Sequence, residues 1–322
     1  MTDYKSVLIT GGAGFIGSTL ADKLLQAALK VIVIDNFNDY YSPAIKNRNV
    51  KNNLNNPDYK LYRGDIEDAA FVNTVFQETK PDLVVHIGAR SGVRPSISDP
   101  VAYVKTNIEG TVNILEAMKT SQIRHMIFAS SSSVYGNSQA TKFSETLDVS
   151  KPISPYAATK STCEQLLYTY SHLYDFQVVC LRFFTVYGPR QRPDLAIKKF
   201  IDLMRDNKPI PVYGDGSTSR DYTYIDDIVS GVIKACNYNA EPYSIINLGS
   251  GAPISLADMI ATIEKVLGKK AVIQRLPMQP GDVQRTYADI SKARKLLGYK
   301  PETCFEEGIK KFVKWENNLL NN

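Results

Sequence analysis

A tyrosine and a lysine four residues apart, Tyr156 and Lys160, form the pattern in this sequence best suited to proton chemistry. They stand in a segment predicted to be helical from Pro155 onward, and this spacing places both side chains on one helix face. A tyrosine with its ordinary pKa of about 10 is a poor base at neutral pH, whereas a neighbouring ammonium favours the phenolate. Taken alone, the pattern also fits a surface Tyr–Lys pair.

Four consecutive serines, Ser130 to Ser133, follow the apolar run Met126–Ala129. Because this run is predicted to be a buried strand, Ser131 is expected at its carboxyl end, where doubly wound sheets bind ligands. A serine hydroxyl at that place can hydrogen-bond a substrate oxygen. Tyr156, Lys160 and Ser131 are therefore the predicted catalytic residues.

A glycine-rich segment near the N-terminus predicts a dinucleotide site. Gly11, Gly14 and Gly17 lie between a predicted strand and a predicted helix. Gly11 permits a tight turn, Gly14 allows the backbone to approach a pyrophosphate, and Gly17 allows helix and strand to pack closely. The next predicted strand ends at Asp35, whose carboxylate can accept hydrogen bonds from a ribose and repel a 2′-phosphate. NAD is therefore expected rather than NADP.

Other residues beside the predicted strand ends are assigned to the same cofactor. Asp65 could reach the adenine, although a plain turn aspartate explains it equally well. Gly88 and Ala89 are small enough for close backbone approach. The full predicted cofactor set is Gly11, Gly14, Phe15, Ile16, Gly17, Asp35, Asn36, Asp65, Ile66, Gly88, Ala89, Tyr156 and Lys160.

Short apolar runs that alternate with helical patterns must position these residues. Strands are predicted at 7–10, 31–34, 59–62, 83–85, 126–129 and 178–181, with helices at 18–28, 69–79, 100–118, 155–174, 196–207 and 256–267. Such alternation predicts an α/β fold, a Rossmann-type doubly wound parallel sheet with a smaller C-terminal α/β substrate domain. The expected division is 1–182 for NAD binding and 183–322 for substrate, and segments near 224–248 could return to the first domain.

Composition narrows the classes of partner. The chain has 322 residues and a formal charge of +5, with Lys and Arg scattered along it, which suits a solvated surface or an anionic small substrate. No apolar run is long enough for a membrane span, and no signal peptide or metal-ligand spacing stands out. The expectation is a cytoplasmic protein with no metal and no nucleic-acid or membrane partner.

Together these motifs resemble the extended short-chain dehydrogenase/reductase superfamily, and within it the nucleotide-sugar 4-epimerases. The resemblance covers nearly the whole chain. It implies that Tyr156 takes the proton of the sugar C4 hydroxyl while hydride passes to NAD⁺, that Ser131 binds the C4 oxygen, and that hydride returns to the other face of the 4-keto sugar. Lys160 would hold the nicotinamide ribose and stabilise the phenolate. NAD would thus be a resident cofactor.

Sister families that dehydrate or decarboxylate the sugar are similar in fold but carry acidic residues just after the catalytic serine. Here those positions are Ser132 and Ser133. Neither can act as an extra acid or base at neutral pH. The resemblance therefore favours epimerisation.

The substrate is indicated by Thr185 and Arg192, which look like the corresponding residues of UDP-glucuronate 4-epimerases. The resemblance implies that Thr185, Ser132, Ser133 and Arg192 surround the C6 carboxylate. It also implies a UDP site in which Arg220 binds the diphosphate, Asp282 binds the uridine ribose, and Arg94 reaches phosphate or sugar. The predicted reaction is UDP-glucuronate to UDP-galacturonate.

Several features keep alternatives open. Gly88 and Arg90 replace the usual Ala and Gln of the family loop, and a modest Thr286 leaves room for an N-acetyl group. UDP-glucose or UDP-N-acetylglucosamine 4-epimerase and a net NAD-dependent oxidoreductase are the alternative functions. A catalytically inactive NAD-binding module would be expected to lack Tyr156 or Lys160. The family also implies a homodimer formed through the helices at 100–118 and 155–174.

Overall fold

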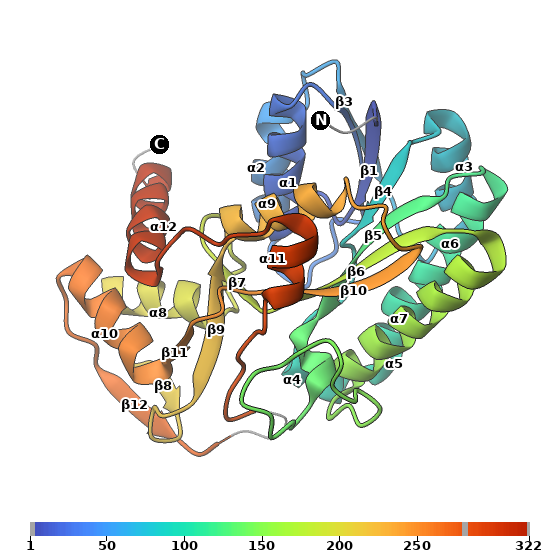
Figure 1. Cartoon of the computed structure of the whole chain (residues 1–322). Coiled ribbons are helices and arrows are strands. Elements are labelled where there is room, and N and C mark those ends of the chain that lie inside the picture. The colour runs from blue at the N-terminus through green and yellow to red at the C-terminus, as the bar shows by residue number, and fades with distance from the viewer. Residues whose placement is uncertain (1–3, 279–282, 321–322) are drawn as a thin grey trace.

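Seven parallel strands form the central sheet of the computed structural model, which describes residues 4–278 and 283–320 (Figure 1). Their order is β10-β6-β5-β4-β1-β2-β3. The strands are β1 (Ser6–Thr10), β2 (Lys30–Asp35), β3 (Tyr59–Arg63), β4 (Leu83–His86), β5 (His125–Ser131), β6 (Gln177–Phe183) and β10 (Tyr243–Leu248). The strand order reverses between β1 and β4, which confirms the predicted doubly wound sheet and places a ligand crevice at that point.

Alternating side chains divide the sheet between two hydrophobic cores. On β1, Val7 and Ile9 belong to one core and Leu8 to the other, as the two-residue period of a strand requires. Helices α1 (Phe15–Gln26), α9 (Ile225–Ala235) and α11 (Ser291–Leu297) contribute to the first core, and α3 (Ala69–Thr79), α6 (Gly110–Thr120) and α7 (Pro155–Tyr174) to the second. Both faces of the sheet are covered, so β4 is buried along its whole length and β1 at all but its first residue.

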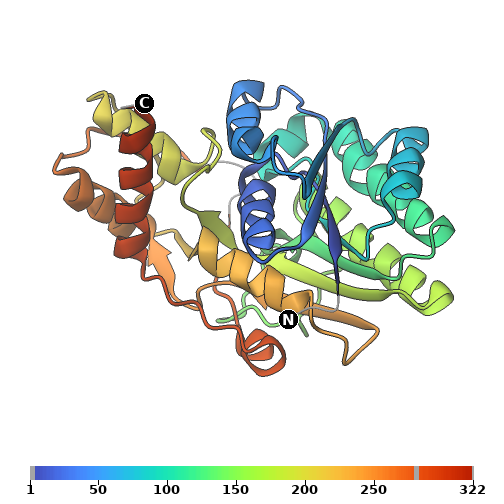
Figure 2. The same ribbon diagram turned by 90° about the horizontal axis from the view of Figure 1, so that it is seen from above.

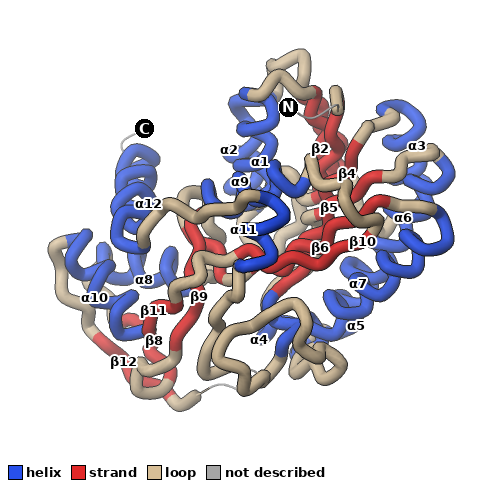
Figure 3. The backbone as a smooth tube through the Cα atoms, in the orientation of Figure 1, coloured by secondary structure: helices blue, strands red, loops and turns tan. Residues whose placement is uncertain are grey.

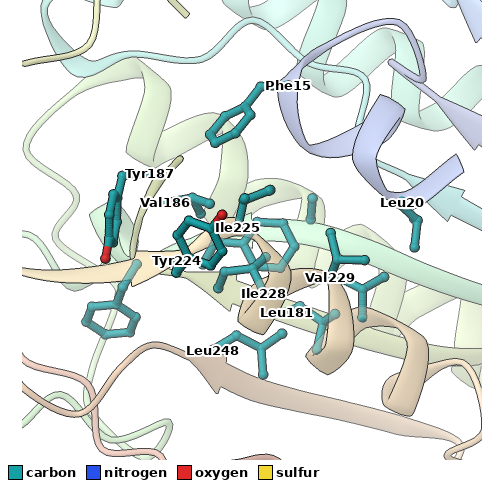
Figure 4. Close-up of a cluster of buried hydrophobic side chains, with 14 of the residues drawn as sticks. Phe15, Leu20, Leu181, Val186, Tyr187, Tyr224, Ile225, Ile228, Val229 and Leu248 are labelled. Carbon is teal, nitrogen blue, oxygen red and sulfur yellow. The ribbon is translucent and has the colours of Figure 1, made fainter. Parts of the chain in front are cut away.

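Helix α9 returns from the second half of the chain to the first core. Figure 4 shows Ile228 and Val229 of α9 beside Leu181 of β6 and Leu248 of β10. Strand β10 then pairs in parallel with β6 along its whole length. Residues far along the sequence thus complete the sheet.

A smaller lobe stands beside the sheet, and Figures 2 and 3 show it at the opposite end of the molecule from α3 and α6. One three-stranded sheet has the order β11-β9-β7, and β12 pairs with β8. These elements are β7 (Thr185–Tyr187), β8 (Ile210–Tyr213), β9 (Ser219–Tyr224), β11 (Pro253–Ser255), β12 (Ile273–Leu276), α8 (Ala196–Arg205), α10 (Leu256–Leu267) and α12 (Phe305–Leu320). The remaining helices are α2 (Pro43–Val50), η1 (Lys51–Asn53), α4 (Val93–Ser98), α5 (Pro100–Tyr103), η2 (Val104–Glu109) and η3 (Ser132–Tyr135).

The helix predicted at 100–118 is interrupted. Its middle, η2, is a π-helical turn between α5 and α6. Asn107 in this turn accepts a hydrogen bond from the Arg90 amide and donates to the Arg90 carbonyl and to the Thr159 hydroxyl. The wider turn therefore carries an amide that links the loop after β4 to α7, a use typical of π-turns near functional sites.

Among the helices of residues 4–278 and 283–320, none combines the length and apolar character that a bilayer crossing needs.

Candidate functional site

A cavity of about 510 Å³ opens at the carboxyl ends of the parallel strands. All of the predicted catalytic and cofactor residues line it, namely Gly11, Gly14, Phe15, Ile16, Gly17, Asp35, Asn36, Asp65, Ile66, Gly88, Ala89, Ser131, Tyr156 and Lys160. Five of the predicted substrate residues line it as well, namely Ser132, Ser133, Thr185, Arg192 and Arg220. The fold thus brings these residues together, while the role of each stays a prediction.

The glycine turn after β1 packs against the loop after β4 without room for side chains. Gly11 has a φ of +69°, and a Cβ atom there would lie 2.8 Å from the Gly88 Cα. A Cβ on Gly17 would overlap the carbonyl oxygen of Gly11. Helix α1 begins after Gly14 with no side-chain cap, so its first N–H groups are left for an anionic group.

The loop after β4 is held by a chain of buried hydrogen bonds. The Gly88 amide donates to Thr10 Oγ1 at 2.9 Å, and Thr10 Oγ1 lies 2.6 Å from His86 Nδ1. Because the Thr111 hydroxyl donates to the Asn107 carbonyl, it accepts from Nε2–H of His86 at 3.0 Å, and Nδ1 therefore accepts the Thr10 proton. Burial and the charge of Lys160 lower the pKa of His86 to about 3, so this imidazole is neutral and fixed in one tautomer.

Asp35 lies at the end of β2 and is almost fully buried. Its carboxylate accepts hydrogen bonds from the amides of Ala13 (3.1 Å) and Phe37 (2.9 Å). Lys46 of α2 places its ammonium 3.4 Å from the same carboxylate and also lines the cavity. Sequence reasoning missed Lys46, because it stands in a polar segment without periodicity.

Asp65, after β3, is held by a neighbour from another loop. Its Oδ2 accepts a hydrogen bond of 2.7 Å from Asn36, and its Oδ1 accepts from the Glu67 amide. The two predicted cofactor residues Asn36 and Asp65 therefore form one polar group in the cavity wall.

Helix α7 presents Tyr156 in its first turn. The Ser154 hydroxyl caps the helix by accepting from the Ala157 amide at 3.1 Å, and Pro155 occupies the first helical position. Burial raises the pKa of Tyr156, whereas the hydrogen bond with Ser131 and the positive charge of Arg192 act to lower it. A bound cation or a further donor at this hydroxyl would bring the pKa down toward the range of a base.

One turn later, Lys160 is 3% exposed and donates a hydrogen bond of 2.7 Å to the Ala129 carbonyl. Burial lowers the pKa of its ammonium to about 8, although Cys163, Glu164 and Cys180 oppose that shift. The lysine is thus held between α7 and the end of β5.

The serines after β5 line the cavity together with Thr185. Ser131 Oγ accepts from the Ser133 hydroxyl at 2.9 Å and from the Ser133 amide at 3.2 Å. Ser132 and Ser133 belong to η3, and Thr185 opens β7. Hydroxyl donors from both lobes therefore face the same cavity.

Arg192 joins three loops at the cavity. Its guanidinium donates to both Asp194 oxygens (2.9 and 2.7 Å) and to Ser91 Oγ, and it lies 5.0 Å from the centre of the Tyr40 ring. The Tyr40 hydroxyl in turn donates to the Ser91 carbonyl. Sequence reasoning missed Ser91, Tyr40 and Asp194, since nothing in their local patterns brings these loops together.

The three residues predicted to bind the UDP portion or the sugar, Arg94, Arg220 and Asp282, differ in their position relative to the cavity. Arg94 is not among the residues that line the cavity, and its guanidinium lies 4.5 Å from the centre of the Tyr213 ring. Arg220 lines the cavity and donates to the Ser219 carbonyl at 2.9 Å. Asp282 lies outside the described residues. No group of three His, Cys, Asp or Glu is placed to hold a metal within the described ranges.

Comparison with known proteins agrees with this site. The GDP-mannose 4,6 dehydratase family profile matches residues 8–312. An uncharacterized protein of Methanocaldococcus jannaschii is 46% identical over 97% of this chain and 96% of its own length. The UDP-glucuronate 4-epimerase of Thermodesulfobacterium geofontis is 44% identical with the same two coverages.

Solved structures give the same result. The UDP-glucuronic acid 4-epimerase of Bacillus cereus, in complex with UDP-glucuronic acid and NAD, superposes with a TM-score of 0.91 at 38% identity. The superposition covers 98% of this chain and 99% of that one. The chain therefore belongs to the GDP-mannose 4,6-dehydratase family of extended short-chain dehydrogenase/reductases, where it groups with the UDP-glucuronate 4-epimerases.

Proposed function

We propose that this protein is an NAD-dependent isomerase that interconverts UDP-glucuronate and UDP-galacturonate by inverting C4 of the sugar. One observation carries the proposal: Ser132, Ser133 and Thr185 line the same cavity as Ser131 and Tyr156. Hydroxyl donors thus surround a place beside the acid–base pair where a hexuronate carboxylate can bind. The bound substrates of the Bacillus cereus relative support this assignment.

The residues present fit NAD. Gly11 and Gly17 leave no space for a Cβ, so the backbone can approach a diphosphate at the start of α1. The Asp35 carboxylate lines the cavity at the end of β2 and can accept hydrogen bonds from ribose hydroxyls. When bound, NAD supplies the hydride acceptor and donor for C4.

The protein's own residues supply the proton chemistry. Tyr156 accepts the C4 hydroxyl proton and later returns it, and Ser131 donates a hydrogen bond to the C4 oxygen. Lys160 contributes a buried positive charge near this pair and a donor for the nicotinamide ribose. General acid–base catalysis of this kind contributes roughly 10²- to 10⁴-fold to a rate.

The hydroxyl donors of Ser132, Ser133 and Thr185 also explain why the substrate keeps its carboxylate. A β-keto acid loses its carboxyl group readily, and hydrogen bonds to the anion hold it in its ground-state geometry. Ser132 and Ser133 stand where related dehydratases and decarboxylases are expected to carry acids, so no extra acid or base is offered there. Arg192 can add positive charge, although Asp194 already accepts two of its hydrogen bonds. Arg220 and Asp282 remain assigned to the UDP portion, and Arg94, which stands outside the cavity lining, to phosphate or sugar.

A homodimer is also proposed, formed through the helical segments at 100–118 and 155–174. Large apolar side chains are exposed there, with Val101 at 63% and Tyr168 at 58%. Large apolar side chains exposed on these helices favour an interface there. A cytoplasmic location is proposed as well, since the four unpaired cysteines suit a reducing compartment. Neither a membrane nor a nucleic acid is assigned as a partner.

The division of the chain into an NAD-binding domain at 1–182 and a substrate domain at 183–322, with 224–248 returning to the first, stays a proposal.

The test is turnover of three substrates by purified protein without added NAD. UDP-galacturonate formed from UDP-glucuronate, resolved by proton NMR, is the expected result. Faster conversion of UDP-glucose or UDP-N-acetylglucosamine would overturn the uronate assignment. Stoichiometric NADH, seen in the absorbance spectrum, would instead indicate a net oxidoreductase.

A further inference from the structure

Three consecutive residues at the end of β5 interact with three successive turns of α7. Ser131 acts to lower the pKa of Tyr156, and the Ala129 carbonyl accepts a hydrogen bond from Lys160. Between them, the Ser130 hydroxyl donates to Glu164 Oε1 at 2.6 Å. Tyr156, Lys160 and Glu164 are spaced by four residues, so they form one stripe on the helix. Glu164 is the member of this stripe to which the proposed reaction gives no task.

Glu164 is paired with an arginine in the interior. Arg182 of β6 donates from Nε to Oε1 at 2.9 Å and from Nη2 to Oε2 at 2.7 Å. The exposed fractions are 3% for Glu164 and 1% for Arg182, and neither is among the residues that line the cavity. The guanidinium also lies 4.8 Å from the centre of the Tyr135 ring.

Stability alone does not account for this pair. A buried ion pair is often no more stabilising than well-packed apolar residues of similar volume, because both charges must be desolvated. Here the pair carries a geometric constraint, since Glu164 holds Ser130, and Ser130 stands between Ala129, which bonds to Lys160, and Ser131, which interacts with Tyr156.

The pair also sets the charge around Lys160. The thiols of Cys163 on α7 and Cys180 on β6 have pKa values raised by burial, so they are uncharged at neutral pH. Burial keeps His86 of β4 neutral and raises the pKa of Tyr156. Glu164 is therefore the carboxylate that opposes the loss of the Lys160 proton, and Arg182 balances its charge.

We infer that Glu164 and Arg182 form a positioning pair for the reaction: Glu164 fixes the end of β5 against α7 through Ser130, and Arg182 holds the Glu164 carboxylate in place and offsets its charge beside Lys160. Neither residue contacts the cavity, so both act through Ser131, Tyr156 and Lys160. The pair is thus a determinant of the pH range of the enzyme.

Two substitutions of opposite electrostatic sign test this assignment. E164Q removes the carboxylate and leaves the Arg182 cation, so the pKa of Lys160 falls and the alkaline limb of the kcat profile moves to lower pH, by on the order of 1 unit. R182M leaves the carboxylate unbalanced, so the limb moves to higher pH. In both variants kcat falls by about tenfold or more, because the two-point pairing with Arg182 that orients the acceptor oxygen of residue 164 toward Ser130 is weakened or lost, while KM changes little.

Ser130 provides the matched control. S130A removes its hydrogen bond to Glu164 and no charge, so kcat falls while the alkaline limb stays in place. E164D keeps the charge and shortens the reach, so it behaves as S130A does. If R182M does not fold, the contrast between E164Q and E164D remains decisive.

Because this assignment rests on the proposed function, the pH dependence of NAD affinity is measured by calorimetry alongside turnover. Lys160 lines the cavity, so its protonation affects binding of the anionic dinucleotide, and opposite shifts in E164Q and R182M are expected there too. Opposite shifts without any UDP-sugar turnover would support the pair and contradict the proposed function. Shifts in one direction, or none, in both variants would overturn the pair.

Discussion

Substituting Gly11 by alanine tests the packing of the proposed cofactor cradle. Gly11 has a φ of +69°, which costs an L-residue about 1 to 2 kcal/mol. Its new Cβ would also lie 2.8 Å from the Gly88 Cα and 2.9 Å from the Gly88 nitrogen. Since carbon atoms in contact prefer about 3.5 to 4 Å, the two loops must separate by roughly 0.7 Å.

Substituting Gly268 separates the cost of the left-handed backbone conformation from the cost of the steric overlap. Gly268 has a nearly identical φ of +66° at the end of α10, and a Cβ there would meet nothing within 4 Å. G268A is therefore expected to lower the free energy of unfolding by about 1 to 2 kcal/mol and to leave NAD affinity unchanged. G11A adds the steric contribution of overpacking, about 1 to 3 kcal/mol more, and weakens NAD binding at least tenfold because its amides move.

Urea unfolding of cofactor-free protein, followed by circular dichroism, gives the free energy of unfolding. Calorimetric titration with NAD gives the NAD affinity. Equal losses of stability in G11A and G268A would show that the Gly11–Gly88 contact carries no cost. Wild-type NAD affinity in G11A would refute the assignment of this turn to the diphosphate.

Three further predictions concern Asp35, Thr185 and His86. D35S removes the carboxylate and leaves the Lys46 ammonium beside the ribose site, so the ratio of NADP to NAD affinity should rise at least tenfold; an unchanged ratio in calorimetry would separate Lys46 from that site. T185V should raise KM for UDP-glucuronate by roughly ten- to a hundredfold, the value of a hydrogen bond to a charged group, and leave KM for UDP-glucose unchanged; equal effects on both would remove Thr185 from the carboxylate site. His86 has a folded-state pKa of about 3, lowered by burial from 6.5, so the unfolded chain binds a proton that the folded chain does not, and stability is lost as pH falls from 6.5 toward 3. Unfolding of H86N should therefore show a pH slope smaller by up to about 1.4 kcal/mol per pH unit, and an unchanged slope would show that His86 is protonated in the folded state.

Local signals made the positions of Gly11, Tyr156 and Lys160 predictable. Closely spaced glycines between a strand and a helix are typical of a dinucleotide-binding turn, and the Ser154–Pro155 pair starts α7 where the sequence indicates. Helix 155–174 is confirmed at both ends. The order of elements likewise predicts the parallel sheet, because alternating strands and helices favour it.

Contacts between distant loops were not predictable in the same way. Tyr40, Ser91 and Arg192 meet because three loops converge at one sheet edge, and no periodicity encodes that meeting. The π-turn η2 was missed because its apolar spacing matches that of an ordinary helix. Glu164 is visible as the next step of the Tyr156–Lys160 spacing, yet its partner Arg182 follows only from the pairing of β5 with β6.

The most direct test of C4 inversion follows the hydrogen on that carbon. UDP-glucuronate carrying deuterium at C4 is incubated with the protein and no added cofactor, and the UDP-galacturonate formed is examined by NMR, with Y156F as the inactive control. Deuterium retained at C4 of the product, without accumulation of NADH, is the predicted result. Loss of the deuterium to solvent, or deuterium retained in a product lacking its carboxylate, would contradict an epimerase built on Tyr156, Ser131 and the hydroxyls around Thr185.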